Sequence, residues 1–307
     1  MPTRSFEPLL YRELAKADAK ETIETASPLL QELVNYATYA FQRCQTSSTG
    51  RQDEDLPILT LYLHIIEMTD GIEVLISQSC PIPAIPLLRS SFEAQLAIDY
   101  ITATQYGQRS FAWLVAYVHQ RLNQYEMFDP SSQRGKQFLS ALTEDGFGRF
   151  MKLPSMPDLP RAVKNLRSLV SKPDYQAVET EYQRLKKTRG REPCWYSLFG
   201  GPSSLRELAK SVSRPAQYDF LYRYWSAVTH ASDLSRFLAR TEEGARGFRP
   251  LRNHRVMAQV ACFAASLILD GTRKALSKFR PGEEKSFATW YNQEARRRYL
   301  SVCQVNS

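Results

Sequence analysis

Apolar side chains recur three and four positions apart along much of the chain. One series is Ile58, Leu61, Ile65, Met68, Ile72 and Leu75, and another is Phe111, Val115, Val118, Leu122 and Tyr125. This spacing places the side chains of each series along one face of an α-helix. No comparable run alternates apolar and polar residues in the way a half-buried strand does. The pattern therefore predicts an all-α fold.

Prolines, glycines and polar stretches separate the expected helices and set their ends to within about 2–4 residues. They predict a bundle of about eight to ten helices. The expected ranges are 6–20, 27–46, 57–79, 85–105, 108–127, 132–149, 160–188, 203–230 (with a break near Pro215 left open), 250–279 and 283–301. We expect residues 1–50 to form an N-terminal helical arm, which could serve dimerisation or simply add helices to the bundle, and residues 51–307 to form an all-α core domain.

Length and composition indicate a globular protein of the cytoplasm. The chain has 307 residues, of which 43% are hydrophobic and 23% charged, and a chain of this size can bury about three quarters of its surface. The first 20 residues are too charged for a signal peptide. The longest apolar run, 256–269, spans about 21 Å as a helix, less than a bilayer core of ~30 Å. The five cysteines are odd in number and form no CxxC pair, which argues against a disulfide scaffold and a cysteine zinc site.

The charge is divided unevenly along the chain. Residues 1–150 hold 12 Lys/Arg and 18 Asp/Glu, whereas residues 151–307 hold 28 and 14. Basic clusters of this kind attract phosphate polyanions without reading sequence. We therefore expect RNA as a possible partner, although solvated helix ends explain the same clusters. The candidate nucleic-acid-binding residues are Lys186, Lys187, Arg189, Arg191, Arg249 and Arg252.

Two segments hold polar residues that could carry chemistry. The helix expected at 85–105 is apolar on nearly all sides, yet Arg89 and Glu93 lie four residues apart on one face. A buried charge pair must be hydrogen-bonded or face a cavity. In the second segment, seven helical steps bring Arg223 and His230 within about 20° of each other, with Ser226 between them. Arginine binds phosphate and histidine exchanges protons near neutral pH, so this pair suits phosphodiester chemistry.

These two segments also carry a resemblance. Residues 85–94, which include Leu-Leu-Arg-Ser, and residues 218–230 resemble the LLRSxxEA and YxxxSxxxH blocks of a bacterial all-helical family of unknown function. More distantly, Arg223 followed after six residues by His230 is similar to the signature of HEPN ribonucleases of toxin and antiphage systems. That resemblance implies a HEPN-like core and a homodimer that cleaves RNA without metal or cofactor. It implies His230 as general base or acid, Arg223 on the phosphate, Glu93 as the accompanying acidic residue, and a neighbouring defence or antitoxin protein as partner.

Other functional classes find less support in the sequence. His64 with Glu67, and His230 with Asp233, could join Glu93 in a di-metal centre, but their order differs from that of the di-iron bundles, and we expect no metal. Ser226, His230 and Asp233 lack the nucleophile elbow of a serine hydrolase. No Walker A or GxGxxG motif occurs. The remaining alternative is a non-catalytic helical binding or sensor module, in which a buried Arg89, Glu93, Ser226 and His230 network only holds the bundle together.

Overall fold

A computed structural model describes residues 10–48, 53–150, 158–229, 237–240, 246–249, 251–252 and 254–304. The chain divides into two compact units. Unit 1 consists of Met1–Ala103 and Ala209–Ser307, and unit 2 consists of Thr104–Leu208. Unit 2 is thus an insertion between the two halves of unit 1. We describe each unit by itself.

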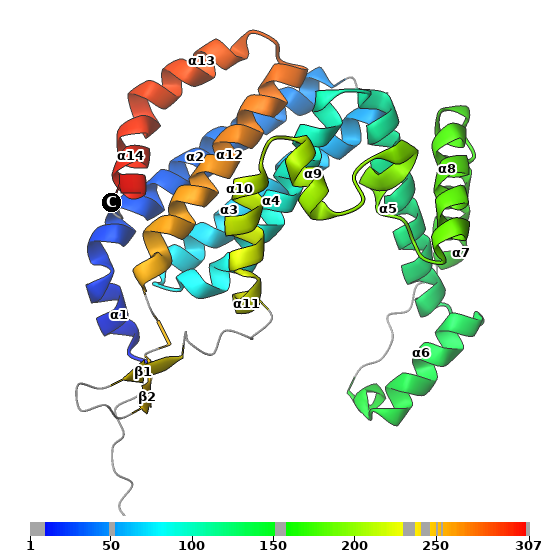
Figure 1. Cartoon of the computed structure of the whole chain (residues 1–307), viewed down its shortest axis with the longest axis horizontal. Helices are drawn as coiled ribbons and strands as arrows, with labels where there is room; N and C mark the ends of the chain where they lie inside the picture. Colours follow the sequence, from blue (N-terminus) through cyan, green and yellow to red (C-terminus); the bar gives the residue numbers. More distant parts are fainter. Residues whose placement is uncertain are drawn as a thin grey trace, which may run out of the picture. The chain divides into compact units, whose positions relative to one another are not determined.

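The first half of unit 1 is a series of helices. They are α1 (Arg12–Asp18), α2 (Lys20–Ser47), the short 3₁₀ turn η1 (Asp53–Asp55), α3 (Leu56–Ser77) and α4 (Pro81–Ala103). The second half contains α10 (Pro215–Gln217), the π-helical segment η4 (Tyr218–Tyr224), α11 (Ser226–Thr229), η6 (His254–Val256), α12 (Met257–Phe279), α13 (Glu283–Trp290), η7 (Tyr291–Ala295) and α14 (Arg296–Gln304). Strands β1 (Leu238–Arg240) and β2 (Arg246–Phe248) form a small antiparallel pair. Figure 1 labels most of these elements.

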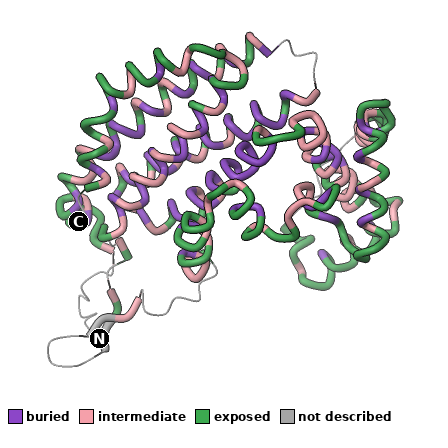
Figure 2. The backbone as a smooth tube through the Cα atoms, turned by 45° about the horizontal axis from the view of Figure 1, so that its top comes forward, coloured by how far each residue is buried: buried purple, intermediate pink, exposed green. Residues whose placement is uncertain are grey.

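The core of unit 1 lies between α2, α3, α4 and α12, which pack side by side (Figure 1). Figure 2 shows buried residues concentrated along these helices. The hydroxyl of the fully buried Tyr62 on α3 joins three of them, since it lies 3.1 Å from the Ala37 carbonyl on α2 and 2.9 Å from Thr272 Oγ1 on α12. Burial raises the pKa of this phenol, so Tyr62 stays a neutral hydrogen-bonding group.

Gly271 lets α12 approach α3 and α4 closely. A β-carbon at this position would lie 3.3 Å from Ile65 Cδ1 and 3.4 Å from Gln95 Oε1. A larger side chain would push the helices apart, because protein interiors have little spare volume. This close approach of α12 to α4 also brings polar residues of the two helices into contact.

Unit 2 contains α5 (Tyr106–Phe128), α6 (Gln133–Glu144), η2 (Phe147–Arg149), α7 (Leu159–Val170), α8 (Pro173–Arg189) and η3 (Trp195–Gly200). Helix α5 packs against α7, α8 and η3 around a core that includes Val115, Val118 and Tyr182. The His119 ring stacks on Tyr182 at 4.3 Å, and its Nε2 lies 2.8 Å from Glu179 Oε2. This pair links α5 to α8. Helix α9 (Leu205–Ser211) spans the boundary at which the chain re-enters unit 1.

The all-α class is confirmed, and the apolar series on 58–75 and 111–125 face the cores of their units. Several expected helix bounds are corrected: α2 begins at Lys20 rather than at 27, α6 ends at Glu144 rather than at 149, and α12 begins at Met257 rather than at 250. The span 160–188 breaks at residues 171–172, because Pro173 begins a new helix there. In the span 203–230, the break near Pro215 is confirmed, since α9 ends at Ser211 and α10 begins at Pro215, and the remainder is divided further into η4 and α11. The β1–β2 pair was not expected either, since its strands are too short to show alternation.

Residues 20–47 form helix α2, which contributes to the core of unit 1. Helix α2 buries Leu29, Leu30 and Leu33 completely or nearly so, and it packs against α3 and α12. The boundaries between the two compact units lie after Ala103 and after Leu208. A boundary of this kind gives no local signal, because it depends on which helices pack together.

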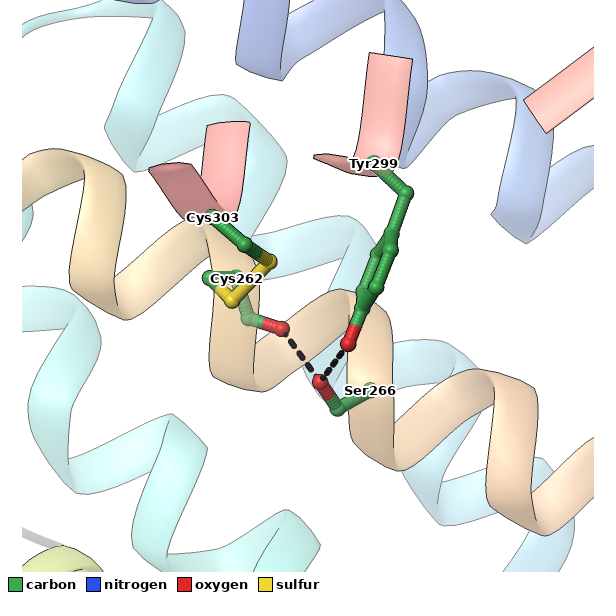
Figure 3. The surroundings of a disulfide bond; sticks show 4 residues. All are labelled: Cys262, Ser266, Tyr299 and Cys303. Carbon is green, nitrogen blue, oxygen red and sulfur yellow. Dashed lines mark hydrogen bonds between the residues drawn. A yellow bond between two sulfur atoms is a disulfide. The ribbon is translucent and has the colours of Figure 1, made fainter. Parts of the chain in front are cut away.

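A disulfide joins the C-terminal helices to the bundle. Cys262 on α12 pairs with Cys303 on α14, 41 residues later. Beside it, the Ser266 hydroxyl lies 2.8 Å from the Cys262 carbonyl oxygen and 2.9 Å from the Tyr299 hydroxyl (Figure 3). The spacing of the cysteines did not indicate this pair, because the helices that carry them meet only in the folded chain.

We expect Cys262→Ser to lower the free energy of unfolding of the oxidised protein by about 2–4 kcal/mol, since the bridge closes a long loop in the unfolded chain. Urea unfolding followed by circular dichroism measures this difference. Cys194→Ser is the control, because Cys194 is exposed and free. Equal stability of the Cys262→Ser and Cys194→Ser proteins would contradict the prediction.

The longest apolar run of the sequence lies within η6 and α12, where most of its residues are buried in unit 1. Across the described residues, none of the helices has the length and apolar character needed to cross a membrane.

Candidate functional site

The two sequence blocks meet in unit 1 through Arg89, Glu93 and Tyr222. Arg89 and Glu93 lie one turn apart on α4, and Tyr222 lies on η4, which packs against α4. The Arg89 guanidinium carbon is 4.1 Å from the centroid of the Tyr222 ring. Such a cation–π contact is worth ~2 kcal/mol when it is shielded from water, and Arg89 is only 7% exposed. The predicted helix face on α4 therefore receives a partner from the second block.

Glu93 is a carboxyl group with a shifted proton affinity. Desolvation by its surroundings raises the pKa of Glu93, while the Arg89 charge and the neighbouring Tyr222 hydroxyl oppose the shift. The pKa of Tyr222 is raised as well, mainly by desolvation and then by the Glu93 charge. A raised carboxyl pKa is what an acid–base catalyst requires near neutral pH. The residue nevertheless remains exposed along part of its surface, so a substrate can reach it.

Helix α4 also carries buried polar atoms without hydrogen-bond partners in the described part of the chain. They are Arg89 Nε, Ser91 Oγ and Gln95 Oε1. Ser90 is different, since its hydroxyl lies 2.7 Å from His64 Nε2 on α3. Unpaired buried polar groups cost about 1–3 kcal/mol each, so α4 is not optimised for stability alone.

A second polar cluster lies further along α4. Arg214, just before α10, places Nε 2.6 Å from Asp99 Oδ2 and a terminal nitrogen 2.9 Å from Asp270 Oδ2 on α12. Asp99 also accepts from Gln95 at 3.1 Å and lies 3.6 Å from Lys274 Nζ. The charged residues of this cluster, Asp99, Arg214, Asp270 and Lys274, line an open cleft of about 450 Å³. The two carboxylates outweigh the desolvation of Arg214, and its pKa is raised. These ion pairs hold the segment just before α10, where the chain re-enters unit 1, against α4 and α12.

The predicted catalytic residues of the second block are placed differently from one another. Arg223 is 71% exposed and lies 4.0 Å from Asp219 on the same segment. Ser226 is half-buried on α11, which packs against α4. His230 lies outside the described residues. The alignment of Arg223 with His230 assumed one continuous α-helix, and this assumption is wrong, because η4 is π-helical and Trp225 separates it from α11.

Four of the predicted nucleic-acid-binding residues lie at the end of α8 or just after it, in unit 2. Lys186 forms an ion pair with Glu192 at 2.7 Å, and an Arg189 terminal nitrogen lies 3.0 Å from Ser197 Oγ. Lys187 and Arg191 are exposed. Two of the four are thus engaged with neighbouring side chains.

The other two basic residues belong to unit 1 and contact backbone carbonyls. Arg249 Nε lies 2.8 Å from the Leu238 oxygen, and Arg252 donates to the Gln78 oxygen. These contacts connect β1 to the segment after β2, and that segment to the end of α3. Each guanidinium still has further donors.

Metal binding finds no support among the residues that the structure describes, where no group of three or more His, Cys, Asp or Glu side chains is arranged to hold an ion. His64 contacts Ser90, and Glu67 is exposed. His230 and Asp233 of the same hypothesis lie outside the described ranges.

Sequence reasoning missed Tyr222 and Arg214. Tyr222 is the first residue of the YxxxSxxxH block, so its place in that pattern could have identified it. Arg214 had no signal, because its partners Asp99 and Asp270 lie 115 and 56 residues away along the chain. Side chains so far apart in sequence come together only through tertiary packing.

The comparisons agree with the first resemblance. A family model described as "Family of unknown function (DUF5677)" matches residues 55–245, more than half of the chain, and this range includes Arg89, Glu93 and Tyr222. Neither a curated protein nor a solved structure matches the sequence. The HEPN relationship stays a prediction. On the family match, the chain belongs to the DUF5677 family.

Proposed function

We propose that this protein is a HEPN-like, metal-independent endoribonuclease of the cytoplasm, with its active site where α4 meets η4 and α11. The observation that carries the proposal is the Arg89–Glu93–Tyr222 cluster, in which a carboxyl of raised pKa lies beside a buried cation. It combines residues of both sequence blocks. The positive second half of the chain supports a polyanionic substrate.

The proposed reaction needs a base, an acid and a cation on the phosphate. The base removes the proton from a ribose 2′-hydroxyl, whose oxygen attacks the adjacent phosphorus. The 5′-oxygen of the next nucleotide leaves and takes a proton from the acid. His230 and Glu93 supply the proton transfers, and Arg223 contacts the phosphate. Arg89 and Tyr222 act as positioning residues, since they surround the Glu93 carboxyl, and Ser226 on the adjoining α11 completes the polar lining. A second copy of the chain completes the site in the proposed homodimer.

The proposed mechanism predicts which chemical ends the cleaved RNA carries. We expect the wild-type protein to cleave a mixed RNA pool in the presence of EDTA and to leave 2′,3′-cyclic phosphate and 5′-hydroxyl ends, because the 2′-oxygen is the nucleophile. Gel analysis and end-specific labelling measure this. A pool whose 2′-hydroxyls are methylated is the control and should stay intact. Cleavage that stops in EDTA, or cleavage of the methylated pool, would contradict the proposal.

The setting of a toxin or antiphage system rests on the HEPN resemblance. Expression of such a nuclease in a bacterial host should slow growth, and co-expression of a neighbouring antitoxin or defence protein should relieve the effect. If the wild-type protein alone left growth unchanged, and growth slowed only when a separate trigger was supplied, that trigger would control the nuclease.

A second candidate is a non-catalytic binding or sensor module. The observation that favours it is the burial of Arg89 under the Tyr222 ring, which joins η4 to α4 whether or not chemistry takes place there. In that case Glu93 serves to balance a buried charge. Its replacement would then destabilise the fold by about 3–5 kcal/mol, and an unfolding measurement distinguishes this loss of stability from a loss of catalysis.

A further inference from the structure

The aromatic residues of η4 form two stacks, one in contact with α4 and the other with α12. Tyr218 stacks on Tyr222 with their ring centroids 5.3 Å apart, and Phe220 stacks on Tyr224 at 5.7 Å with an interplanar angle of 18°. The first stack includes the ring that covers Arg89. The second stack is not used by the proposed catalytic residues, so it needs its own explanation.

The inner end of the second stack is fixed to the core of unit 1. The Phe220 ring lies 5.3 Å from Phe263 on α12 and 5.6 Å from Trp225, which is only 3% exposed. The outer ring is open, since Tyr224 is 68% exposed. A ring that is held on one side and open on the other is a rigid surface for another planar group.

The same segment also carries an exposed cation. Arg223 precedes Tyr224 and is 71% exposed, with its guanidinium 4.0 Å from the Asp219 carboxylate. An exposed ion pair at that distance is weak, so a phosphate group can displace it. An exposed aromatic face and an exposed cation on one segment form the combination that binds single-stranded nucleic acid, because each nucleotide offers a base to stack and a phosphate to pair.

We propose that Phe220, Tyr224 and Arg223 form a stacking platform for single-stranded RNA. A base extends the Phe220–Tyr224 stack on the open face of Tyr224, and Arg223 contacts the adjoining phosphate. The inference rests on the proposed nuclease function and specifies its substrate as unpaired RNA. Duplex RNA is excluded from the platform because its bases already stack on one another.

Binding tests the platform without cleavage. The probe is a short, fluorescently labelled, 2′-O-methylated RNA of mixed sequence, titrated with the full-length protein while anisotropy is measured. We expect Tyr224→Ala to weaken binding about 5- to 150-fold, the range for loss of one base–aromatic stack. Tyr224→Phe keeps the ring and should bind within about twofold of wild type. Tyr39→Ala is the matched control, since Tyr39 is also exposed on unit 1 (64%) but lies on α2.

The phosphate contact has a separate readout. Arg223→Ala should weaken binding and reduce the slope of log affinity against log salt by about 0.7, as one lost phosphate contact on a single strand does. A self-complementary duplex of the same RNA should compete poorly. Equal affinity of Tyr224→Ala and wild type, or equal competition by the duplex, would overturn the platform. The platform would also be overturned if Tyr224→Ala changed the sedimentation of the protein but not its affinity for RNA, because the Tyr224 ring would then contact another protein chain.

The nuclease and the platform can fail separately. Tyr224-dependent binding of the methylated RNA, together with no cleavage of ordinary RNA, supports the platform and removes the nuclease. Cleavage of ordinary RNA with binding that ignores Tyr224 supports the nuclease and overturns the platform.

Discussion

The His230→Ala and Glu93→Gln proteins should each cleave a mixed RNA pool about 10²–10⁴-fold more slowly than wild type, the usual contribution of a general acid or base. Both variants should remain folded by circular dichroism. Removing the imidazole abolishes one proton transfer, and replacing the Glu93 carboxyl by an amide abolishes the other. The assay is carried out in EDTA, so that contaminating metal-dependent nucleases stay inactive.

The pH dependence of the cleavage rate reports on Glu93 as a catalytic base, and the pH dependence of folding stability reports on its desolvation in the folded protein. With its pKa raised by desolvation, an ionised Glu93 acting as base makes the rate of the wild-type enzyme rise as the pH passes through that raised value. This limb of the profile should be missing from the residual activity of Glu93→Gln. The contribution of Glu93 to folding stability changes in the opposite direction with pH. A raised native pKa contributes stability below the ordinary carboxyl pKa, and this contribution is lost as the pH rises through the native value.

It follows that Glu93→Gln should unfold within about 1 kcal/mol of wild type near neutral pH, since the amide replaces a charge that desolvation disfavours. Glu67→Gln is the matched control, because it makes the same change at an exposed position of α3. If Glu93→Gln lost about 3–5 kcal/mol of stability, its inactivity would follow from unfolding, and the binding-module alternative would be preferred. Unchanged cleavage by His230→Ala would remove His230 from the mechanism.

Arg214→Ala should lower the free energy of unfolding by about 3–5 kcal/mol, the cost of breaking a buried ion pair from one side. The Arg214 side chain is 12% exposed and that of Asp99 only 7%. The variant leaves Asp99 with Gln95 and the longer contact to Lys274, and it leaves Asp270 with the longer contact to Arg273. Urea unfolding followed by circular dichroism measures the change.

Arg273→Ala is the matched control for Arg214→Ala. Arg273 pairs with the same Asp270 at 3.7 Å, but its side chain is 61% exposed, so its loss should cost at most about 1 kcal/mol. Adding Asp99→Asn to Arg214→Ala should restore part of the stability, because the unpaired buried charge is then removed. A loss for Arg214→Ala no larger than that for Arg273→Ala would show that the Asp99–Arg214 pair does not hold the re-entering chain.

The pattern of apolar residues was sufficient to predict the helices whose periodicity is strong. Ile58, Ile65 and Ile72 on α3 are fully buried as their spacing indicates. Helical spacing also places Arg89 and Glu93 on one face of α4, and the structure keeps them there. These predictions succeed because the geometry of an α-helix is local, so neighbours three or four positions apart in sequence are neighbours in space.

The same reasoning failed where the backbone leaves the α-helical path. The count that aligned Arg223 with His230 did not anticipate the π-helical turn of η4 or the break at Trp225. The aromatic residues at positions 218 to 225 are equally compatible with an α-helix in sequence. Their packing against α4 and α12 takes place in the tertiary structure, which local periodicity does not describe.

The sequence by itself determined the all-α class, the main helices and the two blocks that contain the candidate site. Tertiary structure alone decided that Tyr222 covers Arg89, that Arg214 joins Asp99 to Asp270, that Cys262 pairs with Cys303, and that residues 104–208 form a unit of their own. The physical reason is one of range. Helix formation depends on residues within a turn or two, whereas a charge pair, a cation–π contact or a disulfide depends on how segments distant in sequence are brought together when their apolar faces are buried.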